Sequence, residues 1–292
     1  MTQVEGRAAF ITGGGNGIGL GIARAFARAN VSLALADIDE RALKAAADEL
    51  SPLTKVETIL MDIRDRSAFL KAADVVEEKL GPVSILVNNA GVGGGAPVTA
   101  LTYELWDWAL GVNLGGVVNG IQTFLSRMLK RKTGGHIVNT ASTAGLAATW
   151  SGALYHTAKF AVVGMSEALA LELKAQGIGV TVLCPGPVAT DIIARTRQSQ
   201  PHVFTEMNDA ERAAARKRTR DLVERITQGA SPDRVGDMVL EAVRNNQLYV
   251  LTDPSIGPFI EARYRAIIDS LPPVDPMQTP RDVAARKVFG PK

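Results

Sequence analysis

The sequence has little of what disulfide-bonded, metal-binding, nucleic-acid-binding or membrane proteins need. It has one cysteine, Cys184, so no internal disulfide can form, and its 3 histidines lack the paired spacing of a zinc site. Lys and Arg number 32 against 30 Asp and Glu, and this near-balance gives no reason to expect nucleic acid or an anionic membrane as a partner. The start lacks a signal-peptide pattern, and no apolar run reaches the roughly 18 residues of a membrane helix. We therefore expect a soluble cytoplasmic protein without a metal.

Short apolar runs alternate with helical patterns from the start of the chain to about Leu183. The runs are mostly apolar on both faces, as strands covered by helices on both sides must be. The expected strands are Ala8–Thr12, Val31–Ala36, Val56–Met61, Ile85–Val87, His136–Thr140 and Gly179–Leu183. Strands that alternate with helices predict right-handed crossovers and a parallel sheet. We therefore predict a doubly wound α/β fold of the Rossmann type in a single domain.

A glycine-rich turn follows the first expected strand and opens the first helix. It reads Thr12-Gly-Gly-Gly-Asn-Gly-Ile-Gly19, a relative of the Gly-x-Gly-x-x-Gly fingerprint. Glycine permits positive φ and lets the backbone approach a pyrophosphate, which the positive end of the helix dipole attracts. Many glycine-rich turns are only tight turns, but this one stands between a strand and a helix. That context favours a dinucleotide site.

Asp37 indicates which dinucleotide is bound. It ends the second strand about 20 residues beyond the turn, where a carboxylate accepts hydrogen bonds from the ribose hydroxyls of adenosine. The same carboxylate repels the 2′-phosphate of NADP, and Asn16 is not the basic residue that would hold that phosphate. The alternative for Asp37 is to cap the next helix, but Asp39 is better placed to do so. We therefore predict NAD rather than NADP as the cofactor.

Tyr155 is the tyrosine, among 4, that has a lysine one helical turn later. The i, i+4 spacing places Tyr155 and Lys159 on one helix face. A phenol titrates near pH 10, but a nearby ammonium and the positive ring of an oxidised nicotinamide favour the phenolate. Lowering the pKa to about 7 takes about 4 kcal/mol, which two close cations can supply in a partly dry site. Taken alone, such a pair is more often two surface neighbours.

Polar and glycine residues also end the other expected strands. They are Asp62, Asn88-Asn-Ala-Gly91, Ser142 and Cys184-Pro-Gly-Pro187. Open α/β sheets bind ligands at this carboxyl edge. A further polar residue, Asn113, lies in the helix that follows the fourth strand. We interpret Cys184 as a small packed residue. His156 is interpreted as structural, because it is adjacent to Tyr155 and neighbours at i, i+1 on a helix point apart.

Together these motifs resemble those of the short-chain dehydrogenase/reductase family, firmly over residues 5–190. The matching motifs are Thr12-Gly-x-x-x-Gly-Ile-Gly19, Asn88-Asn-Ala-Gly91, Asn113, Ser142, Tyr155-x-x-x-Lys159 and Pro185-Gly186. The resemblance implies a seven-stranded sheet of order 3-2-1-4-5-6-7. It also implies a homo-oligomer, commonly a tetramer, with a homodimer as the alternative.

The resemblance further implies a role for each matched residue. Tyr155 corresponds to the general acid/base, and Ser142 to the hydrogen-bonding partner of the substrate oxygen. Lys159 corresponds to the group that holds the nicotinamide ribose, and Asn113 to the anchor of a water that links Lys159 to solvent. Asp62 corresponds to the adenine contact. The full set implied for the cofactor is Gly13, Asn16, Gly17, Ile18, Gly19, Asp37, Ile38, Asp62, Ile63, Asn89, Ala90, Gly91, Tyr155, Lys159, Pro185, Gly186, Val188 and Thr190.

The last hundred residues differ in composition from the core. Asp191–Gln228 is polar and helical and is long enough to fold over a site, so we predict a substrate lid at 191–230. One more strand and two helices are expected, at Gln247–Leu251, Asp233–Asn245 and Ile256–Ser270. The single domain is thus expected to have a dinucleotide-binding and catalytic core at 1–190, the lid, and a final segment at 231–292.

The sequence says less about the substrate. Gly91–Pro97, the loop through Trp150 and the segment after Pro187 are expected to close the pocket, and a long lid favours a bulky, mainly apolar substrate. Some stretches resemble the bacterial NAD-dependent dehydrogenases that oxidise the benzylic alcohol of lignin-derived aryl ethers, namely Tyr103–Val117, Leu248–Val250 and Ala266–Ser270. This resemblance implies oxidation of an aromatic or otherwise bulky secondary alcohol to its ketone.

Two alternatives stay open beside this NAD-dependent alcohol dehydrogenase. A ketone reductase for 3-oxoacyl or steroid-like substrates shares the motifs, but acyl reductases usually use NADPH, and Asp37 argues against that branch. An NAD(H)-binding sensor without turnover is the non-enzymatic alternative, and the complete set of catalytic residues argues against it.

Overall fold

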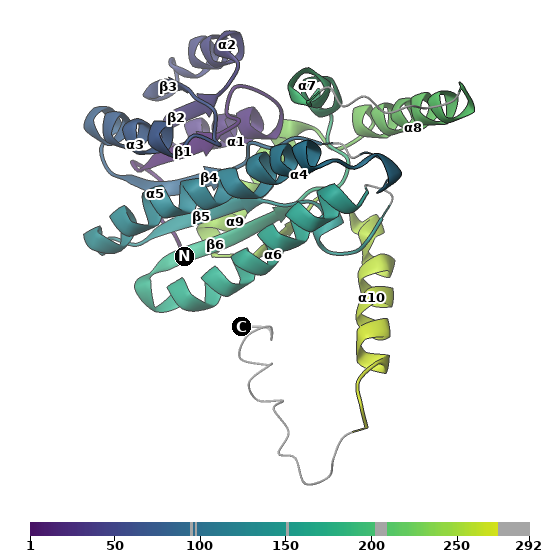
Figure 1. The fold of residues 1–292 in the computed structure, drawn as a ribbon. Helices are drawn as coiled ribbons and strands as arrows, with labels where there is room; N and C mark the ends of the chain where they lie inside the picture. Colours follow the sequence, from purple (N-terminus) through teal and green to yellow (C-terminus); the bar gives the residue numbers. More distant parts are fainter. Residues whose placement is uncertain (94–95, 97, 150–151, 202–208, 274–292) are drawn as a thin grey trace. The chain divides into compact units, whose positions relative to one another are not determined.

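The computed structural model describes residues 1–93, 96, 98–149, 152–201 and 209–273. Within these residues the strands are β1 Ala8–Thr12, β2 Ser32–Asp37, β3 Val56–Leu60, β4 Val83–Asn88, β5 Gly135–Thr140, β6 Ile178–Cys184 and β7 Tyr249–Leu251. They form one parallel sheet in the order β3-β2-β1-β4-β5-β6-β7 (Figure 1). The predicted doubly wound Rossmann-type sheet and its strand order are confirmed.

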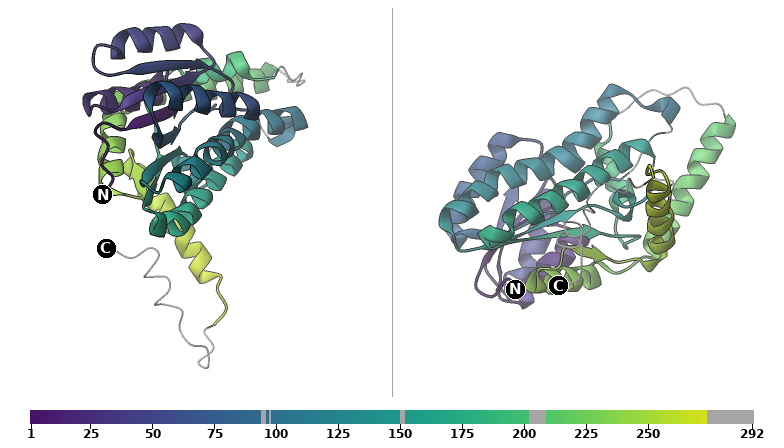
Figure 2. Two further views of the ribbon diagram at one scale, coloured as in Figure 1. Left: turned by 90° about the vertical axis from the view of Figure 1, so that its left-hand side faces the viewer. Right: turned by 90° about the horizontal axis from the view of Figure 1, so that it is seen from below.

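Helices follow the strands throughout the described chain. They are α1 Gly17–Arg28, α2 Glu40–Leu50, α3 Arg66–Leu80, α4 Tyr103–Leu110, α5 Gly116–Arg131, α6 Ala153–Leu173, α7 Ile192–Ser199, α8 Asp209–Thr227, α9 Pro232–Asn245 and α10 Gly257–Asp269. Side chains of α1, α2 and α9 form one apolar core, and those of α3, α5 and α6 form another. The two helical layers lie on opposite faces of the sheet (Figure 2).

The strands β1 and β3 show how burial varies across the sheet. In β1, Ile11 faces the α1 side and Phe10 faces the α3 side, because successive side chains point to opposite faces. In β3, by contrast, Leu60 is exposed and Val56 is only partly buried. The expectation that every strand is covered on both faces is therefore wrong for β3, because it is the edge strand of the sheet.

The chain forms two compact units, Met1–Pro254 and Ser255–Lys292. The first contains the whole sheet and every residue predicted for the site, and the second contains α10. The boundary therefore falls inside the expected final segment 231–292. None of the helices in the described ranges is long and apolar enough to cross a membrane.

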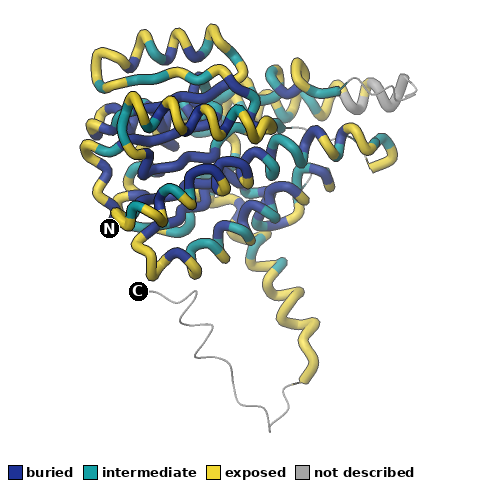
Figure 3. The backbone as a smooth tube through the Cα atoms, turned by 60° about the vertical axis from the view of Figure 1, so that its left-hand side comes forward, coloured by how far each residue is buried: buried dark blue, intermediate teal, exposed yellow. Residues whose placement is uncertain are grey.

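The segment predicted as a lid contains two helices instead of one continuous helical stretch. Between α7 and α8, residues 202–208 lie outside the described residues. Thr196 of α7 is buried, whereas the described side chains of α8 are exposed or only partly buried, and Val223 is an example of an exposed one (Figure 3). Within the predicted lid, α7 is thus the part that packs against the site.

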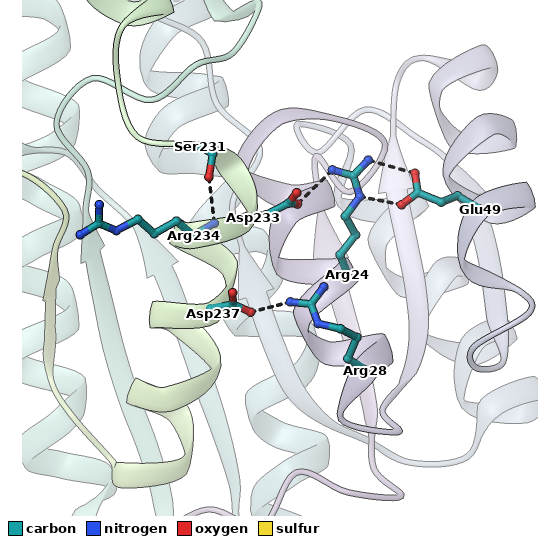
Figure 4. Close-up of polar contacts among 7 residues, drawn as sticks. All are labelled: Arg24, Arg28, Glu49, Ser231, Asp233, Arg234 and Asp237. Atoms are coloured by element: carbon teal, nitrogen blue, oxygen red, sulfur yellow. Dashed lines mark hydrogen bonds and ion pairs between the residues drawn. The ribbon is translucent and has the colours of Figure 1, made fainter.

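Ion pairs join α1 to its neighbours on one side of the sheet. The Arg24 guanidinium lies between Glu49 of α2 (2.6 Å) and Asp233 of α9 (3.0 Å), and Arg28 pairs with Asp237 of α9 (2.5 Å) (Figure 4). All of these pairs are partly exposed, and such pairs contribute only about 0–1 kcal/mol each. The apolar core beneath them therefore carries most of the stability of this layer.

His136 on β5 is a fully buried histidine at the end of the sheet opposite the predicted site. The Thr181 hydroxyl donates to the Gln247 carbonyl (2.7 Å), so it must accept from His136 Nε2 (2.8 Å). His136 Nδ1 then lies 3.2 Å from the Thr2 hydroxyl. Burial lowers the pKa of His136 to about 3, because the charged imidazolium would lose its hydration. The folded protein therefore holds His136 neutral.

We expect His136 to make the protein less stable in mild acid. Its pKa is about 3 when folded and 6.5 ordinarily, so below pH 6.5 the unfolded chain binds a proton that the folded chain does not bind. The stabilisation is fully present above pH 6.5 and is lost at about 1.4 kcal/mol per pH unit as the pH falls towards the folded pKa. Urea unfolding should therefore show about 2 kcal/mol less stability at pH 5 than at pH 7.5. His136→Gln should flatten this slope, and equal slopes in both proteins would contradict the assignment.

Candidate active site

Thr12, the last residue of β1, joins β1 to the end of β4. Its buried hydroxyl oxygen accepts from the backbone amides of Asn89 (2.9 Å) and Ala90 (3.0 Å) and lies 3.4 Å from the Val87 carbonyl. The Asn89 side-chain amide donates in turn to the Thr12 carbonyl (3.1 Å). These contacts hold the predicted Asn89–Gly91 motif directly against the glycine turn.

The glycine turn has the geometry that an anionic ligand needs. Gly13 and Gly17 have φ of +64° and +53°, a region that residues with a Cβ rarely adopt. Asn16 is the N-cap of α1 and makes no side-chain capping hydrogen bond, so the first amides of α1 are left for another acceptor. Uncapped amides and the positive end of a helix dipole fit the pyrophosphate of a dinucleotide.

Asp37 points its carboxylate at this turn. Its Oδ2 accepts from the Gly15 amide (3.2 Å) and the Asn16 side chain (3.3 Å), and its Oδ1 accepts from the Asp39 amide (3.2 Å). Asp39, and not Asp37, caps α2 by accepting from Ala42 (3.0 Å), as the sequence predicted. Asp37 is thus held beside the turn in a position that suits a ribose contact.

Three of the four residues predicted for catalysis, Ser142, Tyr155 and Lys159, lie together at the end of β5. The side chains of Tyr155 and Ser142 share a hydrogen bond, and the Ser142 hydroxyl lies 3.5 Å from the Pro185 carbonyl. Lys159 Nζ lies 5.5 Å from the centre of the Tyr155 ring and donates to the Thr140 carbonyl (3.1 Å). The i, i+4 pair is therefore not a pair of surface neighbours, because Lys159 is only 4% exposed.

Burial controls the ionisation of this group. It raises the pKa of Tyr155 above its usual value, and the hydrogen bond from Ser142 only partly offsets that. Burial also lowers the pKa of Lys159 to about 8. In the free protein burial therefore outweighs the hydrogen bond, and the positive ring of an oxidised cofactor would be a further charge that favours the phenolate. Cys184 is buried with its pKa raised to about 12, which agrees with a packed residue rather than a nucleophile.

Asn113 lies in a π-helical turn, Gly111–Gly115, that joins α4 to α5. Its side chain accepts from the Val92 amide and donates to the Val92 carbonyl, both at 3.0 Å. Gly91 lies directly against it. The side-chain amide therefore holds the Val92 backbone, and the water that the resemblance implies at Asn113 stays a prediction. π-Helical turns are rare and occur often at functional sites.

Asp62 is paired more tightly than the sequence indicated. The Arg64 guanidinium contacts both carboxylate oxygens, with Nη2 2.6 Å from Oδ2, and the Arg64 amide donates to Oδ1 (2.9 Å). Although burial raises it, these hydrogen bonds leave the pKa of Asp62 below its usual value. The adjoining Ile63 is fixed by Asn119, which donates to its carbonyl (2.9 Å). The predicted adenine contact of Asp62 stays a prediction.

The turn after β6 returns the chain to the glycine turn. The Gly186 amide donates to Thr252 (3.1 Å), and Val188 pairs with Ala230 in an isolated bridge. The Thr190 side chain lies against Gly17, where its Cγ2 would be 3.2 Å from an added Cβ. The structure thus gathers residues from the ends of β1, β2, β4, β5 and β6 at one edge. Ile38, which follows Asp37, is largely exposed beside them.

The sequence model of the short chain dehydrogenase family matches residues 7–201 of this chain. The chain belongs to the short-chain dehydrogenase family. It is accordingly an oxidoreductase that acts on CH–OH groups, because relatives that match across most of its length are named dehydrogenases. This agrees with the resemblance drawn from the motifs.

Known relatives extend over almost the entire chain. The C alpha-dehydrogenase of Sphingobium sp. strain SYK-6 is 32% identical over 99% of this chain and 95% of its own length. A CLA biosynthesis dehydrogenase/reductase of Lactiplantibacillus plantarum is 34% identical over 94% and 98%. Among solved structures, a short-chain dehydrogenase/reductase of Burkholderia phymatum in complex with NAD has a TM-score of 0.85 and 33% identity, and the match covers 96% of this chain and all of that one.

In this short-chain dehydrogenase, His156 supports the loop that carries Ser142, a role that no sequence motif indicated. Its Nδ1 lies 2.6 Å from the Ala144 carbonyl, which only accepts, so Nδ1 carries the proton. Nε2 therefore accepts from the Thr149 amide (3.0 Å). The structural interpretation of His156 is thus correct. Trp150, and residues 94–95 and 97 of the predicted pocket, lie outside the described residues.

The helix α7 supplies two further contacts that the sequence did not indicate. Thr196 accepts from the Gly93 amide (2.8 Å), and Ile192 and Ile193 lie against the same glycine. On the same helix, Arg195 reaches Asp39 (3.2 Å) at the start of α2. The helix is therefore fastened to the loops that follow both β4 and β2.

Removing the Thr12 hydroxyl should show how strongly these loops depend on it. Thr12→Val keeps the shape of the side chain but leaves the Asn89 and Ala90 amides without their acceptor, which should lower the free energy of unfolding by about 2–4 kcal/mol. Thr12→Ser keeps the acceptor and should cost only about 1 kcal/mol through the lost methyl. Urea unfolding of the two variants measures the difference. Equal free energies of unfolding for the two variants would show that the Thr12 hydroxyl does not hold these loops in place.

Proposed function

We propose that this enzyme oxidises a bulky, aromatic or apolar secondary alcohol to its ketone, with NAD as hydride acceptor and Tyr155 as general base. The observation that carries the proposal is the arrangement of Tyr155, Ser142 and Lys159 at the sheet edge that also holds the glycine turn and Asp37. A base, a hydrogen-bond donor and a buried cation thus converge beside a dinucleotide cradle. These groups together can accept a proton from an alcohol while its hydride is transferred to a cofactor.

The residues of the chain would divide the chemical work as follows. Ser142 positions the substrate hydroxyl by hydrogen bonding, and the ionised Tyr155 takes its proton. Lys159 stabilises the phenolate through its positive charge, and its remaining N–H groups suit a ribose hydroxyl of the cofactor. The bound NAD supplies hydride acceptance at its nicotinamide ring. Asn113 would hold the Val92 backbone and so the loop that follows β4.

The choice of NAD over NADP rests on Asp37. Its carboxylate is held by the Gly15 amide and Asn16 at the place where an adenosine ribose would lie if the pyrophosphate sits on α1. A carboxylate there accepts from ribose hydroxyls and repels a 2′-phosphate. The NAD in the Burkholderia relative supports the same cofactor.

The substrate class rests on the apolar side chains around the loop after β4. Leu105 and Trp108 of α4 form a cluster with Leu154, the residue before Tyr155, and Val92 packs against that cluster. On its other side the loop meets Ile192 and Ile193. An apolar surround favours a bulky apolar or aromatic alcohol over a short polar one. The full-length match to a C alpha-dehydrogenase points the same way.

The assembly remains part of the proposal. A homotetramer or homodimer is supported by exposed apolar side chains on the outer layer of helices, such as Val118 and Leu129 on α5 and Leu171 on α6. The lid at 191–230 is supported by the contacts of α7.

Tyr155→Phe should separate catalysis from binding. Removing the hydroxyl abolishes proton transfer, so kcat should fall about 10²- to 10⁴-fold, while the affinity for NADH should change by less than about threefold. Turnover is followed by nicotinamide absorbance over a panel of benzylic, steroid and 3-oxoacyl substrates, and NADH binding by fluorescence. Tyr103→Phe, at an exposed position, is the matched control and should leave kcat unchanged. Retained turnover in Tyr155→Phe would overturn the assignment of the base.

Asp37→Ala should weaken NAD binding. Losing a hydrogen bond to a charged group costs about 1.5–3 kcal/mol, so the dissociation constant for NAD should rise roughly ten- to a hundredfold. Asp48→Ala removes an exposed carboxylate from α2 and should leave NAD affinity unchanged. Isothermal titration with the full chain measures both. An unchanged NAD affinity in Asp37→Ala would contradict the role proposed for Asp37.

A further inference from the structure

A second carboxylate, Asp39, lies beside Asp37 and serves two groups at once. Its Oδ1 accepts from the Ala42 amide and so caps α2 (3.0 Å). Its Oδ2 lies 3.2 Å from Arg195 Nη2. The amide of Asp39 donates to Asp37 Oδ1 (3.2 Å), so the two acidic residues form one connected unit. Arg195 of α7 is therefore paired with Asp39, which lies two positions along the chain from Asp37, the carboxylate proposed to select NAD.

Arg195 is brought there by the packing of α7. Thr196, the next residue, is 3% exposed and accepts from the Gly93 amide, which fixes the helix against the loop after β4. At the N-terminal end of α7, Thr190 lies against Gly17 of the glycine turn. Arg195 therefore reaches Asp39 from a helix that is anchored on both sides of the dinucleotide cradle. The fold thus sets the position of the helix, and the Arg195 and Asp39 side chains are 34% and 38% exposed.

The charge state of this pair bears on cofactor choice. The Ala42 amide and the Arg195 guanidinium keep the pKa of Asp39 below its usual value, so Asp39 is ionised at neutral pH and offsets the charge of Arg195. A free guanidinium beside Asp37 would bind the 2′-phosphate of NADP, because arginine forms forked hydrogen bonds with phosphate oxygens. As long as Asp39 engages Arg195, that binding group is occupied.

We propose that Asp39 is a second specificity determinant, which excludes NADP by holding Arg195. The inference rests on the proposed function, in that it assumes a dinucleotide whose adenosine ribose lies at Asp37. It adds to that function a latent phosphate site made of Arg195 and masked by Asp39. Discrimination against NADP then depends on two carboxylates and an arginine that is supplied by another part of the chain.

The test unmasks the site in steps and measures binding of NADPH and NADH to the full-length protein by fluorescence titration. Asp37→Ser removes the first carboxylate. Adding Asp39→Asn in that background keeps the helix cap, because asparagine caps as well as aspartate, but frees Arg195. This step should tighten NADPH binding about three- to tenfold and change NADH binding less than about twofold. Adding Arg195→Gln should abolish the gain, and raising the ionic strength should reduce it.

A matched control separates this effect from a change in net charge. Asp237→Asn in the Asp37→Ser background also removes one negative charge and frees an arginine, Arg28, but it does so on the outer surface of α1 and α9 (Figure 4). NADPH affinity should not respond to it. Unfolding midpoints of all variants show whether each is folded.

Three results would overturn the inference: no NADPH gain from Asp39→Asn, a gain that survives Arg195→Gln, or an equal gain from Asp237→Asn. The first would mean that the Arg195–Asp39 pair only anchors α7, the second that Arg195 is not the phosphate-binding group, and the third that net charge alone changes the affinity. Failure of the proposed function has a different signature, because the unmodified protein would then not bind NADH at all. An unmodified protein that binds NADH, together with variants that lack the stepwise NADPH pattern, would refute only the inference about Asp39.

Discussion

The buried ammonium of Lys159 is the group on which the proposed chemistry depends. It donates to the carbonyl of Thr140, a neutral acceptor, so its charge is not cancelled by that contact. Burial disfavours the charged form and lowers its pKa to about 8, and an anion formed beside the ammonium would in turn favour the charged form. The ionised phenol of Tyr155 is such an anion. The seating of α6 against the end of β5 therefore links the fold directly to the acid–base chemistry.

Side chains that bind backbone groups hold the rest of the site in place. Thr12 fixes the residues after β4, Asn113 fixes Val92, and His156 fixes the loop between Ser142 and Thr149. Each of these side chains forms hydrogen bonds with backbone amides or carbonyls of loops, which have no partner in a helix or strand. Such second-layer hydrogen bonds hold reacting groups in position before the substrate arrives, which is what a precise site requires. A large part of the polar structure of this edge thus serves geometry rather than contact with ligands.

Much of the fold and the site follows from local sequence patterns. The apolar runs predicted the strands to within a few residues, and the buried but polar Ser84 explains why β4 begins earlier than the apolar run Ile85–Val87. The spacing of Tyr155 and Lys159 predicted a shared helix face, and the pair is found together. The prediction was wrong where burial depends on position in the sheet, as for β3. It also did not foresee that burial alone raises the pKa of Tyr155, since desolvation is a property of the surroundings.

Local sequence was enough to predict the alternation of strands and helices, the glycine turn and the tyrosine–lysine pair, because each depends on residues that are close along the chain. Which distant residues meet at the site follows from the packing of the folded chain. Arg195 reaches Asp39 across 156 positions, and His136 meets Thr2 across 134. Such contacts depend on which distant segments pack against each other in the folded chain, and the local periodicity and spacing of residues do not predict that packing. They arise because buried polar groups must find partners in whatever segment the packed fold brings within reach.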